Sequence, residues 1–331
     1  MYSESVNRLL EQWRTSAAPL ERALKGEPGA DWPEARENYL AALATLFPAP
    51  PAVHIADTML AGQPTSLITP SQAEQPAGFI TPPRPGQPTG LAPRSQPHAR
   101  RVLLYLHGGG YASGGRRGYH GLGGRFARRL NAQVYIPDYR LAPEHPFPAA
   151  IDDAFAAYRA LLADGAEPAS IMLAGDSAGG ALVVTLLRKI RDAGLAQPAG
   201  GVALSPWADI SQSGGSAVSR EGRDPLCGVA FLNLLARNYL GAVAATHPDA
   251  SPVFADVSGI APVMIQVGEN EVMLSDALRL AARLGEQRVR VTLEVWPAMF
   301  HVWHLCADVL PEAERAIANA AAFLLGTQAD R

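Results

Sequence analysis

The segment that most constrains the fold spans residues 171–180 and reads Ile-Met-Leu-Ala-Gly-Asp-Ser-Ala-Gly-Gly. An apolar strand there turns at once into a helix through the pattern Gly-x-Ser-x-Gly. A turn this sharp strains the backbone of its serine, Ser177, and side chains two residues to either side would collide with the neighbouring strand and helix, so glycine is required at both places. The pattern predicts that the Ser177 hydroxyl is exposed at the carboxyl end of a sheet, beside the positive end of a helix dipole.

Strands and helices alternate along the chain beyond residue 101. The expected strands are 102–106, 133–137, 171–174, 201–205, 262–267 and 291–295. The expected helices are 124–130, 151–163, 178–193, 276–284 and 311–325. Apolar strands separated by helices are typical of a parallel sheet that is covered on both faces. We therefore predict an α/β fold with a mostly parallel central sheet and helices on both sides.

The N-terminal residues, 1–50, fall outside this alternation. They contain helical patterns at 3–25 and 34–46, and Asp31 and Pro33 are placed to begin the second helix. We expect this segment to be helical and separate from the sheet.

A second interruption covers residues 207–250. This segment has Gly- and Ser-rich turns and one helical pattern at 229–239, so we expect an insertion above the sheet. Residues 51–206 and 251–331 then form the main domain.

Within the main domain, residues 63–98 are rich in Pro, Gly and Gln and contain a short repeat. Its three copies begin at Gln63, Gln75 and Gln87. Each copy has a short β-prone core bounded by prolines, and the copies are offset by an even number of residues, so a shift between copies keeps the same side chains inward. The first copy is favoured as the one that pairs with the sheet, because residues 67–69 have the better β-propensity and follow a possible strand at 58–60. The other two are expected to form a surface excursion.

A serine hydroxyl is a weak nucleophile and requires a base, which in turn requires an orienting acid. In a strand–serine–helix fold the chain order is nucleophile, acid, histidine. Only His301 and His304 follow the last expected strand. We choose His301 because it lies on the loop directly after that strand, and we expect His304 to be a packing neighbour.

The acid should follow the expected strand 262–267. Glu269, Glu271 and Asp276 are the candidates. Asp276 opens an amphipathic helix, where an acidic residue commonly serves the first turn. Glu271 lies on the loop between the strand and that helix, so we choose it and keep Asp276 as the alternative.

The first strong strand ends in His107 followed by Gly108, Gly109 and Gly110. Successive glycines let backbone N–H groups point at a substrate oxygen without side chains in the way. A glycine-rich turn can also hold a phosphate, but neither G-x-G-x-x-G nor a Walker Gly-Lys-Ser/Thr follows here. We therefore predict an oxyanion hole at these glycines.

Over roughly residues 100–325 the chain resembles the bacterial hormone-sensitive-lipase family (family IV) of α/β-hydrolase carboxylesterases. The resemblance rests on His107-Gly108-Gly109-Gly110-Tyr111, Asp138-Tyr139-Arg140-Leu141-Ala142-Pro143-Glu144, Gly175-Asp176-Ser177-Ala178-Gly179-Gly180 and Ser205-Pro206-Trp207. It implies an α/β-hydrolase fold, Ser177 as nucleophile, His301 as base, and the N–H groups of Gly109, Gly110 and Ala178 as the oxyanion hole. It also implies a helical cap made of the N-terminal helices and the insertion after Ser205.

The chain departs from the family's pattern at the acid. The family places its acid in an Asp-Pro-Leu element, and the corresponding stretch here reads Glu271-Val272-Met273, which keeps a carboxylate on a longer arm. The Glu-Val-Met-Leu and His-Val-Trp-His stretches are most similar to members described as monoterpene lactone hydrolases.

Three further residues are candidates for the substrate pocket: Tyr111, which follows the glycines, Asp176 and Trp207. Other aromatic side chains at helical spacing are more often part of a core, namely Trp13, Trp32 and Tyr39. Asp138 and Arg140 are expected to form a structural ion pair.

The sequence thus predicts a serine hydrolase that cleaves small to medium carboxylic esters, with lactones as an alternative substrate, and needs no metal or organic cofactor. A catalytically silent binding module of the same fold and an amidase-type hydrolase are the alternatives. A complete set of nucleophile, acid and base favours the hydrolase over the binding module.

Composition bounds the partners. With 28 basic and 31 acidic residues the chain has no general attraction to nucleic acid or to anionic membranes. Its two cysteines, Cys227 and Cys306, cannot build a disulfide framework or a Cys-rich zinc site. No apolar run is long enough to span a membrane, and the N-terminus lacks the features of a signal peptide, so we expect a cytoplasmic protein. The oligomeric state is left open.

Overall fold

The computed structural model describes residues 2–71 and 101–329, and within them one sheet of eight strands is central. Its members are β1 (Val53–Leu60), β2 (Gln63–Pro70), β3 (Val102–Leu106), β4 (Gln133–Pro137), β5 (Ile171–Asp176), β6 (Gly200–Leu204), β7 (Val263–Gly268) and β8 (Val291–Trp296). The strand order is β1-β2-β4-β3-β5-β6-β7-β8, and neighbouring strands from β4 to β8 in this order are parallel. The predicted mostly parallel sheet is confirmed.

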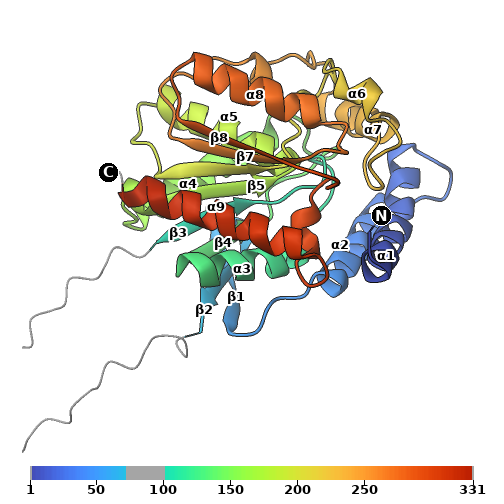
Figure 1. The fold of residues 1–331 in the computed structure, drawn as a ribbon, viewed down its shortest axis with the longest axis horizontal. Helices are drawn as coiled ribbons and strands as arrows, with labels where there is room; N and C mark the ends of the chain where they lie inside the picture. Colours follow the sequence, from blue (N-terminus) through green and yellow to red (C-terminus); the bar gives the residue numbers. More distant parts are fainter. Residues whose placement is uncertain (1, 72–100, 330–331) are drawn as a thin grey trace, which may run out of the picture.

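Helices cover both faces of this sheet (Figure 1). Their bounds are α1 (Glu4–Leu24), α2 (Trp32–Leu46), α3 (His120–Leu130), α4 (Ala149–Ala163), α5 (Ala178–Asp192), α6 (Ser216–Ser219), α7 (Val229–Leu240), α8 (Leu274–Glu286) and α9 (Pro311–Ala329). α3 and α9 pack on one face, and α4, α5 and α8 pack on the other. Alternate residues of β5 belong to the two cores: Leu173 faces the α5 side, whereas Met172 and Ala174 face α3 and α9.

The order of the strands reverses direction near the centre of the sheet. β3 lies between β4 and β5, so the connection after β3 moves toward one edge while the later strands move toward the other. Loops at the carboxyl ends of strands separate at such a reversal and leave a crevice for ligands. The glycines after β3 and Ser177 after β5 both lie at this point.

The two N-terminal helices begin as the sequence predicts. The Asp31 carboxylate accepts a hydrogen bond from the Glu34 N–H at 2.8 Å, and Pro33 occupies the first turn of α2. In α1 the Ser3 hydroxyl accepts from the N–H of Val6. The apolar stripe of α1 is buried against the rest of the molecule through Val6, Leu10, Trp13, Leu20 and Leu24.

The first copy of the short repeat is β2, which confirms that it pairs with the sheet. It runs antiparallel to β4 on one side and to β1 on the other. A tight turn at Ala61 and Gly62, both with positive φ, joins it to β1. The copies that begin at Gln75 and Gln87 lie outside the described residues.

The expected ion pair between Asp138 and Arg140 is wrong. Asp138 pairs with Arg116, whose Nε lies 3.0 Å from its carboxylate, and Arg140 pairs with Asp153 of α4 at 2.7 Å. Each charge meets a partner from an element that packs beside it. Proximity in sequence did not reveal those partners.

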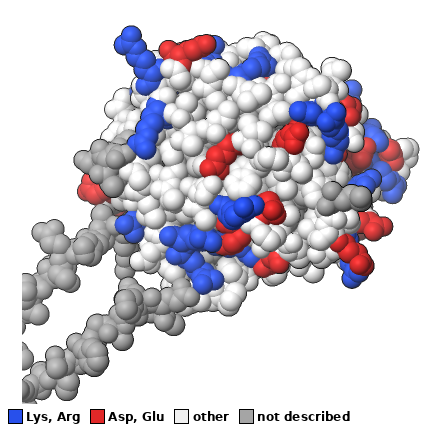
Figure 2. All heavy atoms as spheres, in the orientation of Figure 1, with Lys and Arg blue, Asp and Glu red and all other residues white. Residues whose placement is uncertain are grey.

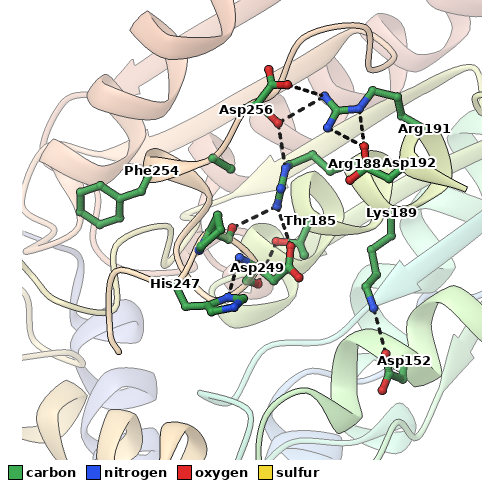
Figure 3. Close-up of polar contacts among 12 residues, drawn as sticks. Asp152, Thr185, Arg188, Lys189, Arg191, Asp192, His247, Asp249, Phe254 and Asp256 are labelled. Carbon is green, nitrogen blue, oxygen red and sulfur yellow. Dashed lines mark hydrogen bonds and ion pairs between the residues drawn. The ribbon is translucent and has the colours of Figure 1, made fainter. Parts of the chain in front are cut away.

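The end of the insertion 207–250 is fixed to α5, the helix that begins after Ser177. Arg188 of α5 donates to the Pro248 carbonyl at 3.1 Å, to the Asp249 carboxylate at 2.8 Å and to the Asp256 carbonyl at 2.9 Å. Figure 3 shows Arg188 reaching Asp249 and Asp256. The Arg188 side chain is buried, so these charge-assisted bonds are shielded from water. The insertion is thereby anchored where it returns to the sheet.

The surface carries both signs of charge. On the face shown in Figure 2, acidic and basic side chains are interspersed and no field of a single sign covers it. In the described part of the chain, no helix combines the length and apolarity needed to traverse a bilayer.

Candidate active site

Ser177 occupies the turn between β5 and α5 with φ 54° and ψ −120°. A positive φ in a non-glycine residue costs on the order of 1–3 kcal/mol and persists only where the surroundings impose it. A Cβ on Gly179 would lie 1.9 Å from the Leu106 carbonyl oxygen of β3, and one on Gly175 would lie 2.4 Å from the Gly179 carbonyl oxygen. The expectation that glycine is required at both places is confirmed.

Ser177, His301 and Glu271 are joined by hydrogen bonds. The Ser177 hydroxyl lies 2.9 Å from Nε2 of His301, and Nδ1 of His301 lies 2.9 Å from Oε2 of Glu271. A carboxylate only accepts, so Nδ1–H donates to Glu271 and leaves Nε2 free to accept from the serine hydroxyl. The structure therefore brings together the three side chains that the sequence singled out as nucleophile, base and acid.

The surroundings of His301 set its proton affinity. Burial by itself lowers the pKa of His301, but the hydrogen bond and charge of Glu271, helped by Asp224 and Asp176, outweigh it and raise this pKa above its ordinary value. The raised pKa makes the imidazole a stronger base.

Glu271 is held by donors on its second oxygen. Its Oε1 accepts from the Ser205 hydroxyl at 2.7 Å and from the Gly268 N–H at 2.6 Å. The Ser205 hydroxyl also accepts from the N–H of Val302, next to His301, at 3.1 Å. Ser205 thus links the acid to the histidine loop.

The other candidates for base and acid have different partners. His304 is buried, with Nε2 at 3.0 Å from Gln266 Oε1, and burial lowers its pKa to about 3. The half-buried Glu269 accepts from the N–H of Ala298. Asp276 is buried in the first turn of α8, but its carboxylate accepts from the N–H of Asp209 at 2.9 Å, in the insertion, rather than from its own helix.

The glycines after β3 differ in what their N–H groups do. Gly108 donates to Oδ1 of Asp176 at 3.0 Å, so its predicted place in the oxyanion hole is wrong. For the N–H groups of Gly109 and Gly110 no protein acceptor exists among the described residues, and both residues have positive φ. Ala178 is the first residue of α5, where an N–H has no acceptor within its own helix. These three N–H groups can bind a substrate oxygen.

The Asp176 carboxylate is the reason that the Gly108 N–H is unavailable to a substrate oxygen. Its buried carboxylate also accepts from the hydroxyls of Tyr105 at 2.8 Å and Tyr119 at 3.1 Å. Burial raises the pKa of Asp176 to about 6, against the opposing effect of these donors. Because Asp176 directly precedes Ser177, its contact with Gly108 holds the start of the glycine loop close to Ser177.

An apolar cavity that opens to solvent at its mouth leads to Ser177. α1 contributes Trp13, Arg14, Ala17 and Leu20 to its wall. The insertion contributes Leu226, Cys227, Phe231, Leu232 and Leu235. Asp176 and Trp207 also line it, as predicted.

Other aromatic residues fall differently from expectation. Tyr111 is not among the residues that line the cavity, because its ring stacks on Tyr239 with 3.9 Å between centroids. Trp13 belongs to a hydrophobic core with Tyr39 packed against it, as expected, but both also line the cavity. The Trp13 Nε1–H donates to the Tyr39 hydroxyl at 2.9 Å. Trp32 lies outside the lining, beneath the Arg36 guanidinium.

Sequence reasoning gave no role to Ser205 or to Asp224, whose carboxylate accepts from the His301 N–H at 2.7 Å. Ser205 had a signal, because it directly follows β6 and so lies at the same edge as Ser177. Asp224 had none, since it lies in an irregular turn of the insertion. Among the described residues no cluster of His, Cys, Asp and Glu is arranged to hold a metal ion.

Known proteins are similar to this chain in sequence and in fold. Residues 103–305 match a family described as alpha/beta hydrolase fold. An acetyl-hydrolase from Streptomyces hygroscopicus is 46% identical over 224 residues, which cover 68% of this chain and 75% of the relative. An esterase from Acinetobacter venetianus is 31% identical over 238 residues, 72% of this chain and 78% of the relative.

A crystal structure of an esterase from the bacterial hormone-sensitive lipase family superposes with a TM-score of 0.83 at 35% identity and covers 99% of both chains. The likeness thus extends beyond the matched family segment to the N-terminal helices. The sharp turn at Ser177, the sheet order and these matches together show that the chain belongs to the alpha/beta hydrolase fold family.

Proposed function

We propose that the protein is a serine carboxylesterase that cleaves small to medium esters through an acyl-enzyme at Ser177. The observation that carries the proposal is the continuous chain of hydrogen bonds from the Ser177 hydroxyl through His301 to Glu271, at the end of an apolar cavity. The relatives named acetyl-hydrolase and esterase support a carboxylesterase-like hydrolase. A binding module that lacks catalysis has no need of a base 2.9 Å from a serine hydroxyl.

In this mechanism His301 Nε2 accepts the hydroxyl proton as the Ser177 oxygen attacks the ester carbonyl carbon. The developing oxyanion is stabilised by the N–H groups of Gly109, Gly110 and Ala178, which are already oriented and need no rearrangement. Glu271 stabilises the imidazolium through Nδ1–H.

The second half repeats these steps with water. His301 first gives its proton to the leaving alcohol, and the Ser177–acyl ester remains. Water then loses a proton to Nε2 of His301 and attacks the acyl carbon, and Ser177 recovers its proton when the acid is released.

The cavity supports the substrate size. Its wall is built mainly from aromatic and aliphatic side chains of α1 and the insertion, which suit a short to medium acyl chain. We propose that residues 1–50 and 207–250 act as a cap over the main domain. Lactones, which carry the same reacting carbonyl, remain a second substrate class for the same machinery.

The test is hydrolysis of p-nitrophenyl acetate, butyrate, octanoate and palmitate, with a lactone and an N-acetyl amide beside them. Ser177→Ala should lower kcat by at least about 10³-fold, because the nucleophile is removed while one oxygen contributes little to packing. Ser219→Ala, at an exposed serine outside the cavity, is the matched control. Retained hydrolysis in a folded Ser177→Ala variant would refute the proposal, and a preference for the amide would redirect it to amidase chemistry.

A further inference from the structure

Asp224 is a buried carboxylate in the insertion that the mechanism above does not use. It lies in the turn before α7 and is 9% exposed. Its Oδ2 accepts from the backbone N–H of His301 at 2.7 Å, a contact across 77 residues of sequence. Its Oδ1 accepts from the N–H groups of Leu226 and Cys227 at 2.8 and 3.1 Å.

The two ends of this carboxylate hold parts of the site with different tasks. Leu226 and Cys227 line the cavity, whereas His301 faces Ser177. A buried carboxylate loses its hydration, and the three N–H donors offset this cost only in part, because burial raises the pKa of Asp224 to about 6.

We propose that Asp224 is a positioning residue, which fixes the backbone of His301 and the cavity wall at Leu226 and Cys227 in one arrangement. The base is then held in line with the Ser177 hydroxyl when the insertion is seated on the main domain. This inference rests on the catalytic role proposed above for His301.

Charge adds a second consequence. The titratable groups that face Asp224 are His301, Glu271, the Cys227 thiol and the Tyr2 hydroxyl. Those that face His301 are Glu271, Asp176 and Asp224, with His304 on its own loop. Because the Asp224 charge helps to raise the pKa of His301, its removal should lower that pKa.

The substitution Asp224→Asn separates the contact of Asp224 with His301 from its contacts with Leu226 and Cys227. An asparagine side-chain oxygen can still accept from Leu226 and Cys227 in the local turn. Its NH₂ group would then face the His301 N–H, donor against donor, so the link to the histidine loop is lost. The control is Glu221→Gln, since Glu221 is an exposed carboxylate of the same insertion that accepts from the N–H of Val229 and does not contact His301.

The experiment measures kcat and KM for p-nitrophenyl acetate between pH 5 and 9, together with amide hydrogen exchange. For Asp224→Asn we expect kcat to fall about tenfold or more, because small displacements of a catalytic group are costly. The acid limb of kcat/KM should move to lower pH by on the order of half a unit. Exchange at the His301 amide should accelerate at least about tenfold, while Leu226 and Cys227 change less.

Asp224→Glu serves as the charge-conserving variant. It should keep the acid limb near that of the wild type while kcat stays low, because the longer arm cannot place both oxygens as before. Glu221→Gln should match the wild type in every measurement.

Two outcomes would overturn the proposal. One is an Asp224→Asn enzyme with kcat within twofold of the wild type and an unmoved acid limb. The other is a loss of activity with unchanged His301 exchange and an unmoved limb, which indicates a structural role alone. If the wild type neither hydrolyses esters nor is labelled at Ser177 by a fluorophosphonate, the proposed function fails instead. Hydrogen exchange at the His301 amide then still decides whether Asp224 fixes the backbone of His301.

Discussion

Glu271 and Asp276 are five positions apart and both are buried, yet they contact different parts of the molecule. Glu271 accepts from His301, whereas Asp276 accepts from the backbone of the insertion at Asp209 and Ala208. Burial raises the pKa of Asp276 well above its usual value, so its charge is unfavourable where it lies. The two carboxyls should therefore respond differently to amidation.

Glu271→Gln should lower kcat about 10²- to 10⁴-fold, because the imidazolium loses its compensating charge and its preferred tautomer. Asp276→Asn keeps an acceptor for Asp209 and should leave kcat within about twofold. Steady-state kinetics on p-nitrophenyl acetate checks the ranking, and the reverse order would show that Asp276 is the acid.

The two carboxyls also differ in what their amidation changes as pH varies: enzyme activity for Glu271 and stability for Asp276. The proposed mechanism requires neutral His301. We therefore expect kcat/KM of the wild type to fall as pH drops through the raised pKa of His301, and Glu271→Gln should move that limb to lower pH. The folded-state pKa of Asp276 exceeds its unfolded value, so this group costs stability increasingly as pH rises from acid to neutral. Asp276→Asn should thus gain stability relative to the wild type at pH 8 and lose that gain near pH 4 in urea unfolding.

At single residues the sequence predicts which side chains can react better than it predicts which groups are available to a substrate. Ser177, His301 and Glu271 were predictable because each follows a strand at the same edge of a parallel sheet. Gly108 was misassigned because its N–H is taken by Asp176, a side chain whose direction no spacing rule supplies. Tyr111 was misassigned for a similar reason, since a stacking partner 128 positions later, Tyr239, holds its ring away from the cavity.

At the scale of elements, the β5–α5 junction depends on contacts that allow no Cβ. Gly179 lies in the first turn of α5, and a Cβ there would meet backbone oxygen of β3 at 1.9 Å. Gly326 lies inside α9, and a Cβ there would meet nothing within 4 Å. The same glycine-to-alanine change should therefore have opposite effects in the two helices.

We expect Gly179→Ala to lose at least about 3 kcal/mol of unfolding free energy, since backbone must move to admit the methyl group. Gly326→Ala should gain about 1 kcal/mol, because alanine favours a helix interior. Chemical denaturation of both variants measures the difference. A Gly179→Ala protein that unfolds with the wild-type midpoint would contradict the steric argument.

Element boundaries were largely predictable, and the exceptions have a physical cause. The strands β3 to β8 and the helices after them stand out because apolar runs alternate with 3.6-residue periodicity. β1 was expected only at residues 58–60, although it begins at Val53. It lies at the edge of the sheet and is half-buried, so its pattern lacks the continuous apolar run of the central strands.

For the whole molecule, the cavity is assembled from segments that are remote in sequence. α1 supplies one part of the wall and the insertion another, while Ser177 and His301 come from the main domain. No local pattern could show that Trp13 and Leu232 share a pocket. Substrate size should accordingly depend on α1 as well as on the loops that carry out the chemistry.

Ala17 and Ala18 offer a matched test of this dependence. Ala17 lines the cavity, whereas its neighbour Ala18 is exposed and is not part of the lining. Ala17→Trp should lower kcat/KM for p-nitrophenyl octanoate about tenfold relative to acetate, because the larger ring takes space needed by the longer acyl chain. Ala18→Trp should leave the ratio of the two substrates unchanged, and an equal effect of both variants would place the acyl chain elsewhere.

The attachment of the insertion at both of its ends has a consequence for recombining this chain with its relatives. At its start the Trp207 N–H donates to the Ser177 carbonyl at 3.0 Å, and at its end Arg188 holds Pro248 and Asp249 against α5. These two anchors mark natural junctions for a chimaera. A foreign segment spliced between them would inherit a fixed entry and exit, and would need to bring only a carboxylate equivalent to Asp224 to engage the histidine loop.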